Sequence, residues 1–76
     1  MNIKLRLYGS LHRYGKKDGW FEQEILAETS VKDILLALGL PISSVSFITV
    51  DGSKQPLEYI LKGGEEVRVF PQVTGG

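Results

Sequence analysis

Hydrophobic and polar residues alternate near the start of the chain, over residues 2–8. Ile3, Leu5 and Leu7 would lie on one face of an extended strand, and Tyr8 would lie on the other together with the basic residues between them. This period of two is typical of a strand that is buried on one face only. The segment therefore predicts a half-buried β-strand.

Three further segments have the composition of strands: residues 20–26, 45–50 and 67–70. They are rich in β-branched and aromatic residues, which favour strands. In the first, Phe21 and Ile25 are the expected core residues. The second is closed by an Asp-Gly dipeptide, which is a strong signal for a tight turn.

One apolar stripe with helical spacing predicts a short helix. At positions i, i+3, i+4 and i+7 it contains Val31, Ile34, Leu35 and Leu38. Ser30 precedes the stripe as a candidate N-cap, and Asp33 stands where a capping box has its acidic residue. Gly39 is the expected C′ residue. So short a helix needs tertiary packing to be stable.

The apolar residues of segment 57–61 predict one more helical turn, and residues 62–66 predict a reverse turn. The expected order of elements is therefore β-β-α-β, this helical turn, and β. A hairpin, one helix on a face of the sheet, and later strands that complete a mixed sheet give an α+β domain of two layers.

Length and composition restrict the function further. The chain has 76 residues and no cysteine, which excludes disulfides, thiolate metal sites and a cysteine nucleophile. A domain of this size offers little room for a walled active-site cavity. The only histidine, His12, is expected in a solvated loop, and Glu22 and Glu24 are expected to pair with basic neighbours on the sheet surface. No catalytic site, bound cofactor or metal is expected in the chain itself.

The net charge is zero, but the charges are unevenly distributed. Residues 1–20 contain five basic residues and one acid, hence +4, whereas residues 21–76 contain four basic residues and eight acids, hence −4. The zero sum argues against general nucleic-acid binding. The asymmetry fits either an ordinary solvated surface or a dipolar surface that orients a partner. There is no apolar run long enough to span a bilayer and no signal peptide pattern, so a cytoplasmic protein without membrane contact is expected.

The chain's last residues are its most unusual feature. Division into a folded domain, residues 1–70, and a flexible tail, residues 71–76, is expected, and the tail ends in Gly75 and Gly76. Fully extended, the tail would reach about 20 Å. Glycines without Cβ atoms can enter a channel too narrow for other residues. Either the end is merely frayed, or the carboxylate of Gly76 is a reactive group.

A reactive terminal carboxylate would need activation by another protein. An α-carboxyl group has a pKa of about 3.3–3.7, so in the cell it is an anion and a poor electrophile. Adenylation with ATP would activate it, and nothing in this chain is expected to bind ATP. A sulfur nucleophile could then convert the acyl adenylate into a thiocarboxylate. The absence of cysteine suits such a carrier, because no internal thiol competes for the activated carbonyl.

Five short fragments that are spread along nearly the whole chain stand in a suggestive order. They are GSLHR at 9–13, TSVKDIL at 29–35 with Gly39, VDG at 50–52, LKGGEEV at 61–67 and FPQVTGG at 70–76. Together they resemble the MoaD/ThiS family of ubiquitin-like sulfur carriers, whose matching patterns include T-V-x-D-L-L, V-N-G and L-x-D-G-D-E-V. The ending is similar to F-P-P-V-x-G-G, which is typical of the MoaD branch.

The resemblance implies a β-grasp fold and the role of the small subunit of molybdopterin synthase. A partner adenylyltransferase related to ubiquitin-activating enzymes would activate Gly76 with Mg-ATP, and a sulfur donor would then load it. The thiocarboxylate would deliver sulfur within the large subunit of molybdopterin synthase, and Gly75 would give access to the narrow channel. Phe70, Pro71 and Tyr8 would form the docking surface, unless they only pack against each other.

Several positions depart from the family pattern. Gln72 replaces the second proline of the ending, Asp51 replaces an asparagine and Gly63 replaces an acid, and the segment around Trp20 matches no branch. Carriers for tRNA thiolation or thiazole synthesis, and ubiquitin-like modifiers conjugated to lysines through Gly76, share the expected fold and ending. These alternatives stay open, as does a noncovalent interaction module with an inert tail.

Overall fold

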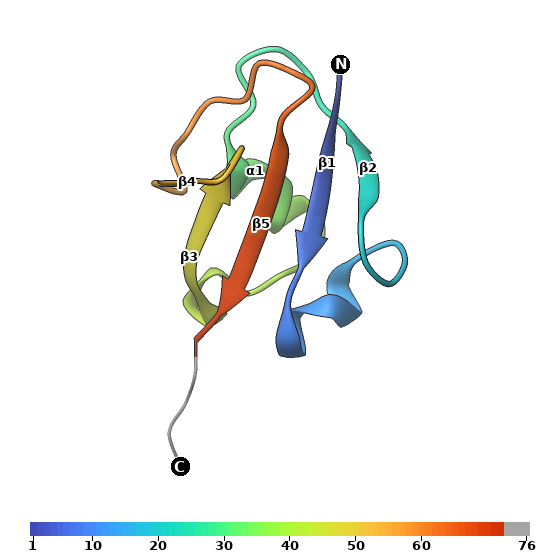
Figure 1. Ribbon diagram of the computed structural model, residues 1–76, viewed down its shortest axis with the longest axis vertical. Helices are drawn as coiled ribbons and strands as arrows, with labels where there is room; N and C mark the ends of the chain where they lie inside the picture. Colours follow the sequence, from blue (N-terminus) through green and yellow to red (C-terminus); the bar gives the residue numbers. More distant parts are fainter. Residues whose placement is uncertain (73–76) are drawn as a thin grey trace.

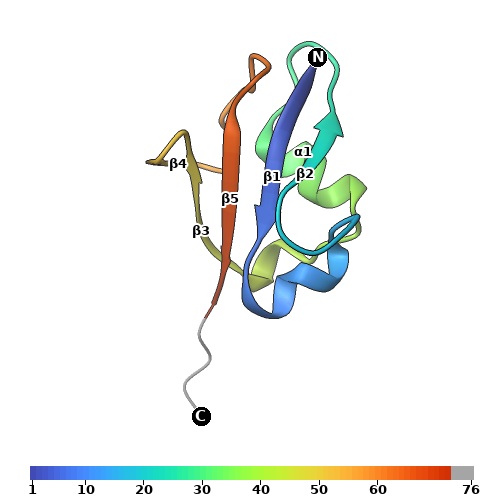
Figure 2. The same cartoon turned by 45° about the vertical axis from the view of Figure 1, so that its right-hand side comes forward.

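The computed structural model describes residues 1–72 and consists of a five-stranded sheet with one α-helix packed on it (Figures 1 and 2). Gly75, Gly76 and the rest of the expected tail beyond Gln72 lie outside the described residues. The strands are β1 (Asn2–Leu7), β2 (Phe21–Glu24), β3 (Val45–Val50), β4 (Ser53–Gln55) and β5 (Glu66–Pro71). Their order in the sheet is β2-β1-β5-β3-β4, and the helix α1 spans Val31–Ala37. The predicted α+β fold with a mixed sheet is confirmed.

The two central strands, β1 and β5, run parallel and follow the predicted alternation. Leu5 lies opposite Val67 and Leu7 lies opposite Val69, and all four side chains are buried on the helix side. All other neighbouring strands pair antiparallel. Because β1 and β5 are parallel, both end at the same end of the molecule, opposite the end that carries the N-terminus (Figure 1). The residues that follow them are therefore close together.

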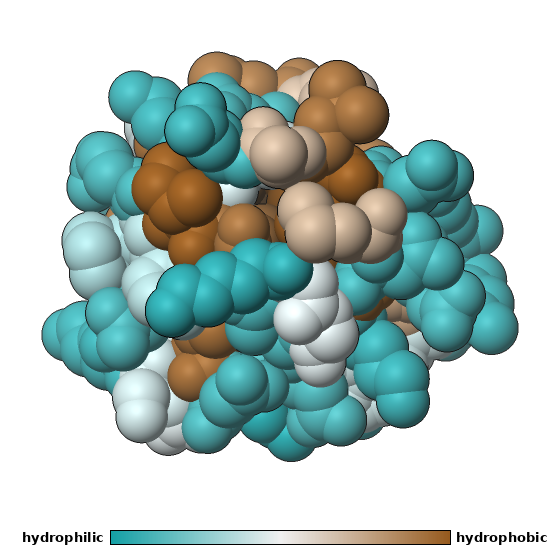
Figure 3. All heavy atoms as spheres, turned by 90° about the horizontal axis from the view of Figure 1, so that it is seen from above, coloured by the Kyte–Doolittle hydropathy of each residue, from teal (hydrophilic) through white to brown (hydrophobic). Residues whose placement is uncertain are grey.

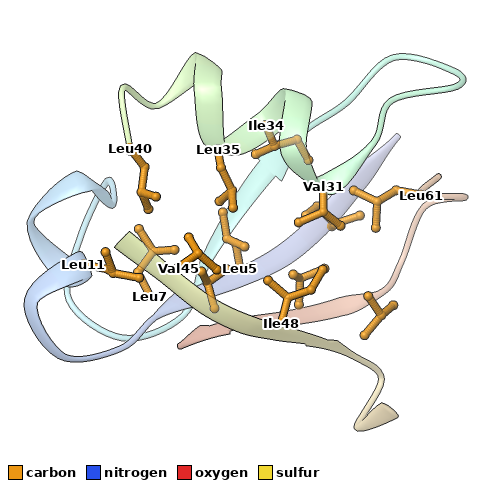
Figure 4. Close-up of a cluster of buried hydrophobic side chains, with 14 of the residues drawn as sticks. Leu5, Leu7, Leu11, Val31, Ile34, Leu35, Leu40, Val45, Ile48 and Leu61 are labelled. Atoms are coloured by element: carbon orange, nitrogen blue, oxygen red, sulfur yellow. The ribbon is translucent and has the colours of Figure 1, made fainter. Parts of the chain in front are cut away.

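The helix closes the core from one side, as Figure 4 shows for Val31, Ile34 and Leu35 above the sheet. These three side chains are buried, and Leu38 packs against them partly buried. The predicted stripe is thus correct. Removal of this apolar surface from water is the main contribution that holds the short helix in place.

Both helix ends follow the predicted signals. The Asp33 backbone N–H donates to Ser30 Oγ and the Ser30 N–H donates to Asp33 Oδ2, each at 3.1 Å, so the capping box is complete. Gly39, at the C′ position after the C-cap Leu38, has a φ of +81°, where glycine is favoured.

We expect Ser30→Ala to lower the free energy of unfolding by about 1 kcal/mol, because the Asp33 N–H loses its acceptor. Urea unfolding followed by circular dichroism measures the change. The matched control is Ser10→Ala at an exposed serine, which should stay within about 0.5 kcal/mol of the wild type. If both substitutions lowered the free energy of unfolding equally, Ser30 would not stabilise the helix as its N-cap.

The predicted helical turn over residues 57–61 is reduced to a hydrogen-bonded turn at Leu57 and Glu58, in which the Tyr59 N–H donates to Pro56 O at 3.0 Å, and no helix follows. Ile60 instead forms an isolated antiparallel bridge with Ser30, and the buried Leu61 donates its N–H to Thr29 O. The segment is tied to the start of the helix by these long-range bonds, which local spacing does not reveal. The short strand β4 and the 3₁₀ helices at Gly9–Tyr14 and Ile42–Ser44 were also not predicted.

The buried Glu65 fixes the turn before β5. Its carboxylate accepts hydrogen bonds from the backbone N–H groups of Lys62, at 2.8 Å, and Gly63, at 2.7 Å. Gly63 and Gly64 both have positive φ, and the carboxylate satisfies donors that this tight backbone would otherwise leave unpaired. The turn predicted for 62–66 is present, and its acid has a structural role.

The end of the molecule that carries the N-terminus shows hydrophobic patches between polar side chains (Figure 3). Large exposed hydrophobic side chains of the protein include Met1, Leu26 and Ile60. Single exposed apolar side chains are normal for small domains and require no ligand.

Candidate functional site

Three aromatic rings stack side by side across the face of the sheet opposite the helix. Tyr8, directly after β1, stacks on Phe70 of β5, and Phe70 stacks on Phe47 of β3, with both centroid distances 4.6 Å. The interplanar angles are 16° and 15°. We call these three residues the aromatic stack. Aromatic pairs of this kind stabilise by about 0.5–1.5 kcal/mol each beyond their buried area.

The structure places Tyr8 and Phe70 together as the sequence predicted, but Phe47 was missed. Simple alternation along 45–50 would put Phe47 on the same face as the buried Val45. A register shift between Val45 and Phe47 breaks the alternation, so that Phe47 faces outward, 36% exposed, and Ile48 faces the core. A β-bulge of this kind re-aims the following side chains. No signal in the sequence located it.

Two cations cover the outer ends of the aromatic stack. The Arg6 guanidinium lies 5.0 Å from the Tyr8 ring centroid, and the Lys54 ammonium lies 5.5 Å from that of Phe47. Each cation contributes about 0.5–1 kcal/mol at an exposed ring. The result is an apolar centre with a basic rim, which is a usual design for a protein–protein contact surface.

Beyond the aromatic stack, β5 ends at Pro71, one residue later than expected. Gln72 is then held by two hydrogen bonds, from its backbone N–H to Ser44 O at 2.9 Å and from its side-chain amide Nε2 to Val45 O at 3.4 Å. Gln72, the last described residue, is therefore held in a fixed position beside the aromatic stack. The residues after Gln72 therefore begin next to the predicted docking residues Tyr8, Phe70 and Pro71.

Gly9 allows Pro71 to take this position. The φ of Gly9 is +56°, and a Cβ added there would lie 2.8 Å from Pro71 Cγ. Such a contact is too short for carbon atoms, and the left-handed backbone itself disfavours a side chain. The ends of β1 and β5 can approach each other because residue 9 has no side chain.

We expect Gly9→Ala to destabilise the fold by about 2–3 kcal/mol, because the left-handed backbone and the contact with Pro71 both oppose the new methyl group. Gly39→Ala is the matched control. Its φ is also positive, but nothing lies within 4 Å of the added Cβ. It should cost about 1 kcal/mol less in urea unfolding. Equal costs would show that the contact with Pro71 contributes nothing.

The remaining candidate residues lie apart from this site. His12 is exposed, and its Nδ1 lies 3.0 Å from Gly9 O within the 3₁₀ helix Gly9–Tyr14. Glu22 and Glu24 are exposed, and Glu22 lies beside Lys4 in the sheet. In the described range 1–72, no group of three or more His, Asp or Glu residues could hold a metal ion. No helix there is long and apolar enough to cross a membrane.

The strand order β2-β1-β5-β3-β4 with one helix on one face and the last strand at the centre is that of the ubiquitin-like β-grasp fold. The family model described as Mut7-C ubiquitin matches residues 1–75, and the chain belongs to this family. No curated protein sequence matches the chain significantly.

Solved structures share the fold over the full chain. SAMP1 from Haloferax volcanii is 19% identical, with a TM-score of 0.73 and 100% of both chains covered. A putative molybdopterin converting factor subunit 1 from Pyrococcus furiosus is 20% identical, with a TM-score of 0.72, 95% of this chain and 98% of that chain covered. A chain in the complex of molybdopterin-converting factor subunits 1 and 2 from Helicobacter pylori is 19% identical, with a TM-score of 0.63 and full coverage of both. The predicted resemblance to the MoaD/ThiS group of ubiquitin-like proteins is confirmed at the level of the fold.

Proposed function

We propose that this protein is a cytoplasmic sulfur carrier whose reactive group is the carboxylate of Gly76. The observation that carries the proposal is the position of Phe70 in the aromatic stack, in the strand that leads directly toward Gly75 and Gly76. The four residues after Gln72 can span at most about 14 Å. A partner that docks on Tyr8, Phe70 and Pro71 would thus have the reactive group within reach.

The chemistry needs a partner at each step. In the first step an adenylyltransferase binds Mg-ATP, the Gly76 carboxylate attacks the α-phosphate, and pyrophosphate leaves. In the second step a sulfur donor, in the simplest case hydrosulfide, attacks the acyl carbon, and AMP leaves with the bonding electrons. The product is a thiocarboxylate. The chain itself supplies the docking surface and the carboxylate, and the proposal requires that Gly76 carries a free carboxyl group.

The sulfur acceptor that we favour is a precursor of molybdopterin, bound by a large partner subunit. Support comes from the molybdopterin converting factor neighbours and from the ending FPQVTGG. Delivery for tRNA thiolation or thiazole synthesis would use the same Gly76 thiocarboxylate and differs only in the acceptor.

A second function, conjugation to other proteins, is favoured by the similarity to SAMP1, one structure of which is named a small archaeal modifier protein. In that case a neutral lysine amine would attack the acyl carbon of the Gly76 adenylate, an isopeptide bond would form, and AMP would leave as the amine loses a proton. Peptide mapping of lysine adducts distinguishes this outcome from sulfur loading.

Intact-mass spectrometry tests the proposal. The chain is incubated with the adenylyltransferase of its own organism, Mg-ATP and sulfide. Replacement of one oxygen by sulfur at Gly76 should raise the mass by about 16 Da. Omission of ATP is the control and should leave the mass unchanged. No gain with an adenylyltransferase that is active on its own carrier would contradict the proposal.

A further inference from the structure

A second feature of the outer sheet face lies between β1, β2 and β5, beside the aromatic stack. Three basic side chains line a hollow beside the only tryptophan, Trp20: those of Lys4, Lys17 and Arg68. Arg6 does not line it but is the cross-strand neighbour of Arg68, and we call these four residues the basic cluster. The segment around Trp20 matches no branch of the family pattern, and the proposed sulfur chemistry does not use it.

Within the basic cluster, Arg6 and Arg68 are direct cross-strand neighbours in the parallel pair β1–β5. Like charges in this position destabilise a sheet. Each guanidinium lies over a different aromatic ring: Arg68 lies 4.9 Å from the Trp20 ring centroid, and Arg6 lies 5.0 Å from that of Tyr8. A guanidinium stacked on a ring keeps in-plane N–H donors available for a carboxylate. An incoming anion would also relieve the repulsion between the two arginines.

The surface beside Trp20 is hollowed. An open hollow of about 540 Å³ is lined by Lys4, Lys17, Trp20 and Arg68, among others. Two acids, Glu22 and Glu66, also line it and lie on either side of Lys4 in the sheet. The hollow is therefore basic at Arg68, and two residues further along the strands the two acids flank Lys4.

We propose that this hollow docks an acidic segment of a partner protein, with carboxylates that bind Arg68 in the hollow and Arg6 beside it. The mixed charges favour a protein over a nucleic acid. Glu22 and Glu66 would repel a continuous phosphate chain, whereas a peptide can place acids against the arginines and a basic or amide group against the glutamates. The zero net charge of the chain also disfavours a polyanion. This inference does not depend on sulfur transfer.

The emission of Trp20 reports on the site directly, because the chain has one tryptophan. The probe is a blocked peptide of alternating Glu, Asp and Gly residues, and its counterpart has Lys at each acidic position. We expect the acidic peptide to change Trp20 emission saturably and the effect to weaken as salt is raised. The lysine peptide should have no such effect. No change with the acidic peptide, or equal changes with both, would overturn the proposal.

Charge reversal locates the binding. Arg68→Glu should lower the affinity for the acidic peptide by about tenfold. Amide chemical-shift titration measures this affinity, because the variant itself alters the environment of Trp20. Lys32→Glu on α1 makes the same change in net charge on the other layer and should bind as the wild type does. Arg6→Gln is the second variant if Arg68→Glu does not fold, and it should weaken binding several-fold.

Equal weakening by Lys32→Glu would show a nonspecific charge effect and overturn the proposal. Tighter binding of a short oligothymidylate than of the acidic peptide would also overturn it, because the site would then prefer polyanions.

Discussion

Removal of Gly75 and Gly76 is expected to abolish sulfur loading completely, so that the mass gain of about 16 Da disappears. The chain would then end at Thr74, whose side chain stands beside the carboxylate and could not enter a channel built for glycines. The hydrogen bonds of Gln72 to Ser44 and Val45 do not involve the removed residues, so circular dichroism should show that the sheet persists.

The control for this truncation is Thr74→Ala in the full-length chain. Thr74 stands at the variable position of the ending, so this variant should load sulfur like the wild type. A truncated chain that still gains 16 Da would show that the sulfur is attached elsewhere. The carrier proposal would then fail, even if the docking surface were correct.

Phe70→Ala is expected to weaken docking to the adenylyltransferase by about 100-fold, equivalent to about 2.7 kcal/mol. Phe70 is the middle ring of the aromatic stack, so its loss removes both stacked pairs at once and leaves Tyr8 and Phe47 without a common partner. Isothermal titration calorimetry measures the affinity, and circular dichroism verifies that the sheet persists.

The control for Phe70 is Leu36→Ala on α1. Leu36 is 54% exposed on the other layer of the domain, so its loss removes a similar apolar side chain without touching the aromatic stack. It should leave the affinity unchanged. If Phe70→Ala binds as tightly as the wild type, the aromatic stack only stabilises the sheet, which is the alternative that the sequence left open.

Much of the candidate site was predictable because it depends on the central strands. Tyr8 and Phe70 both follow regular alternation from a buried residue, so their common face could be inferred before their distance was known. Lys54 and Phe47 could not be inferred. β4 has only three residues, and the bulge in β3 that exposes Phe47 leaves no local trace. The segment 57–61 was misinterpreted for a related reason, since its bridge to Ser30 connects distant parts of the chain.

The sequence by itself determined the elements that depend only on interactions between residues near each other in the chain. The faces of β1 and β5 follow from a period of two, and the helix follows from its apolar stripe, its capping box and Gly39. The tertiary structure alone decided which residues meet across strands: the third ring of the aromatic stack, the contact between Gly9 and Pro71, and the arginine pair beside Trp20. Side-chain direction within a strand is fixed by the backbone, whereas register, bulges and strand order depend on pairing between segments far apart in the chain.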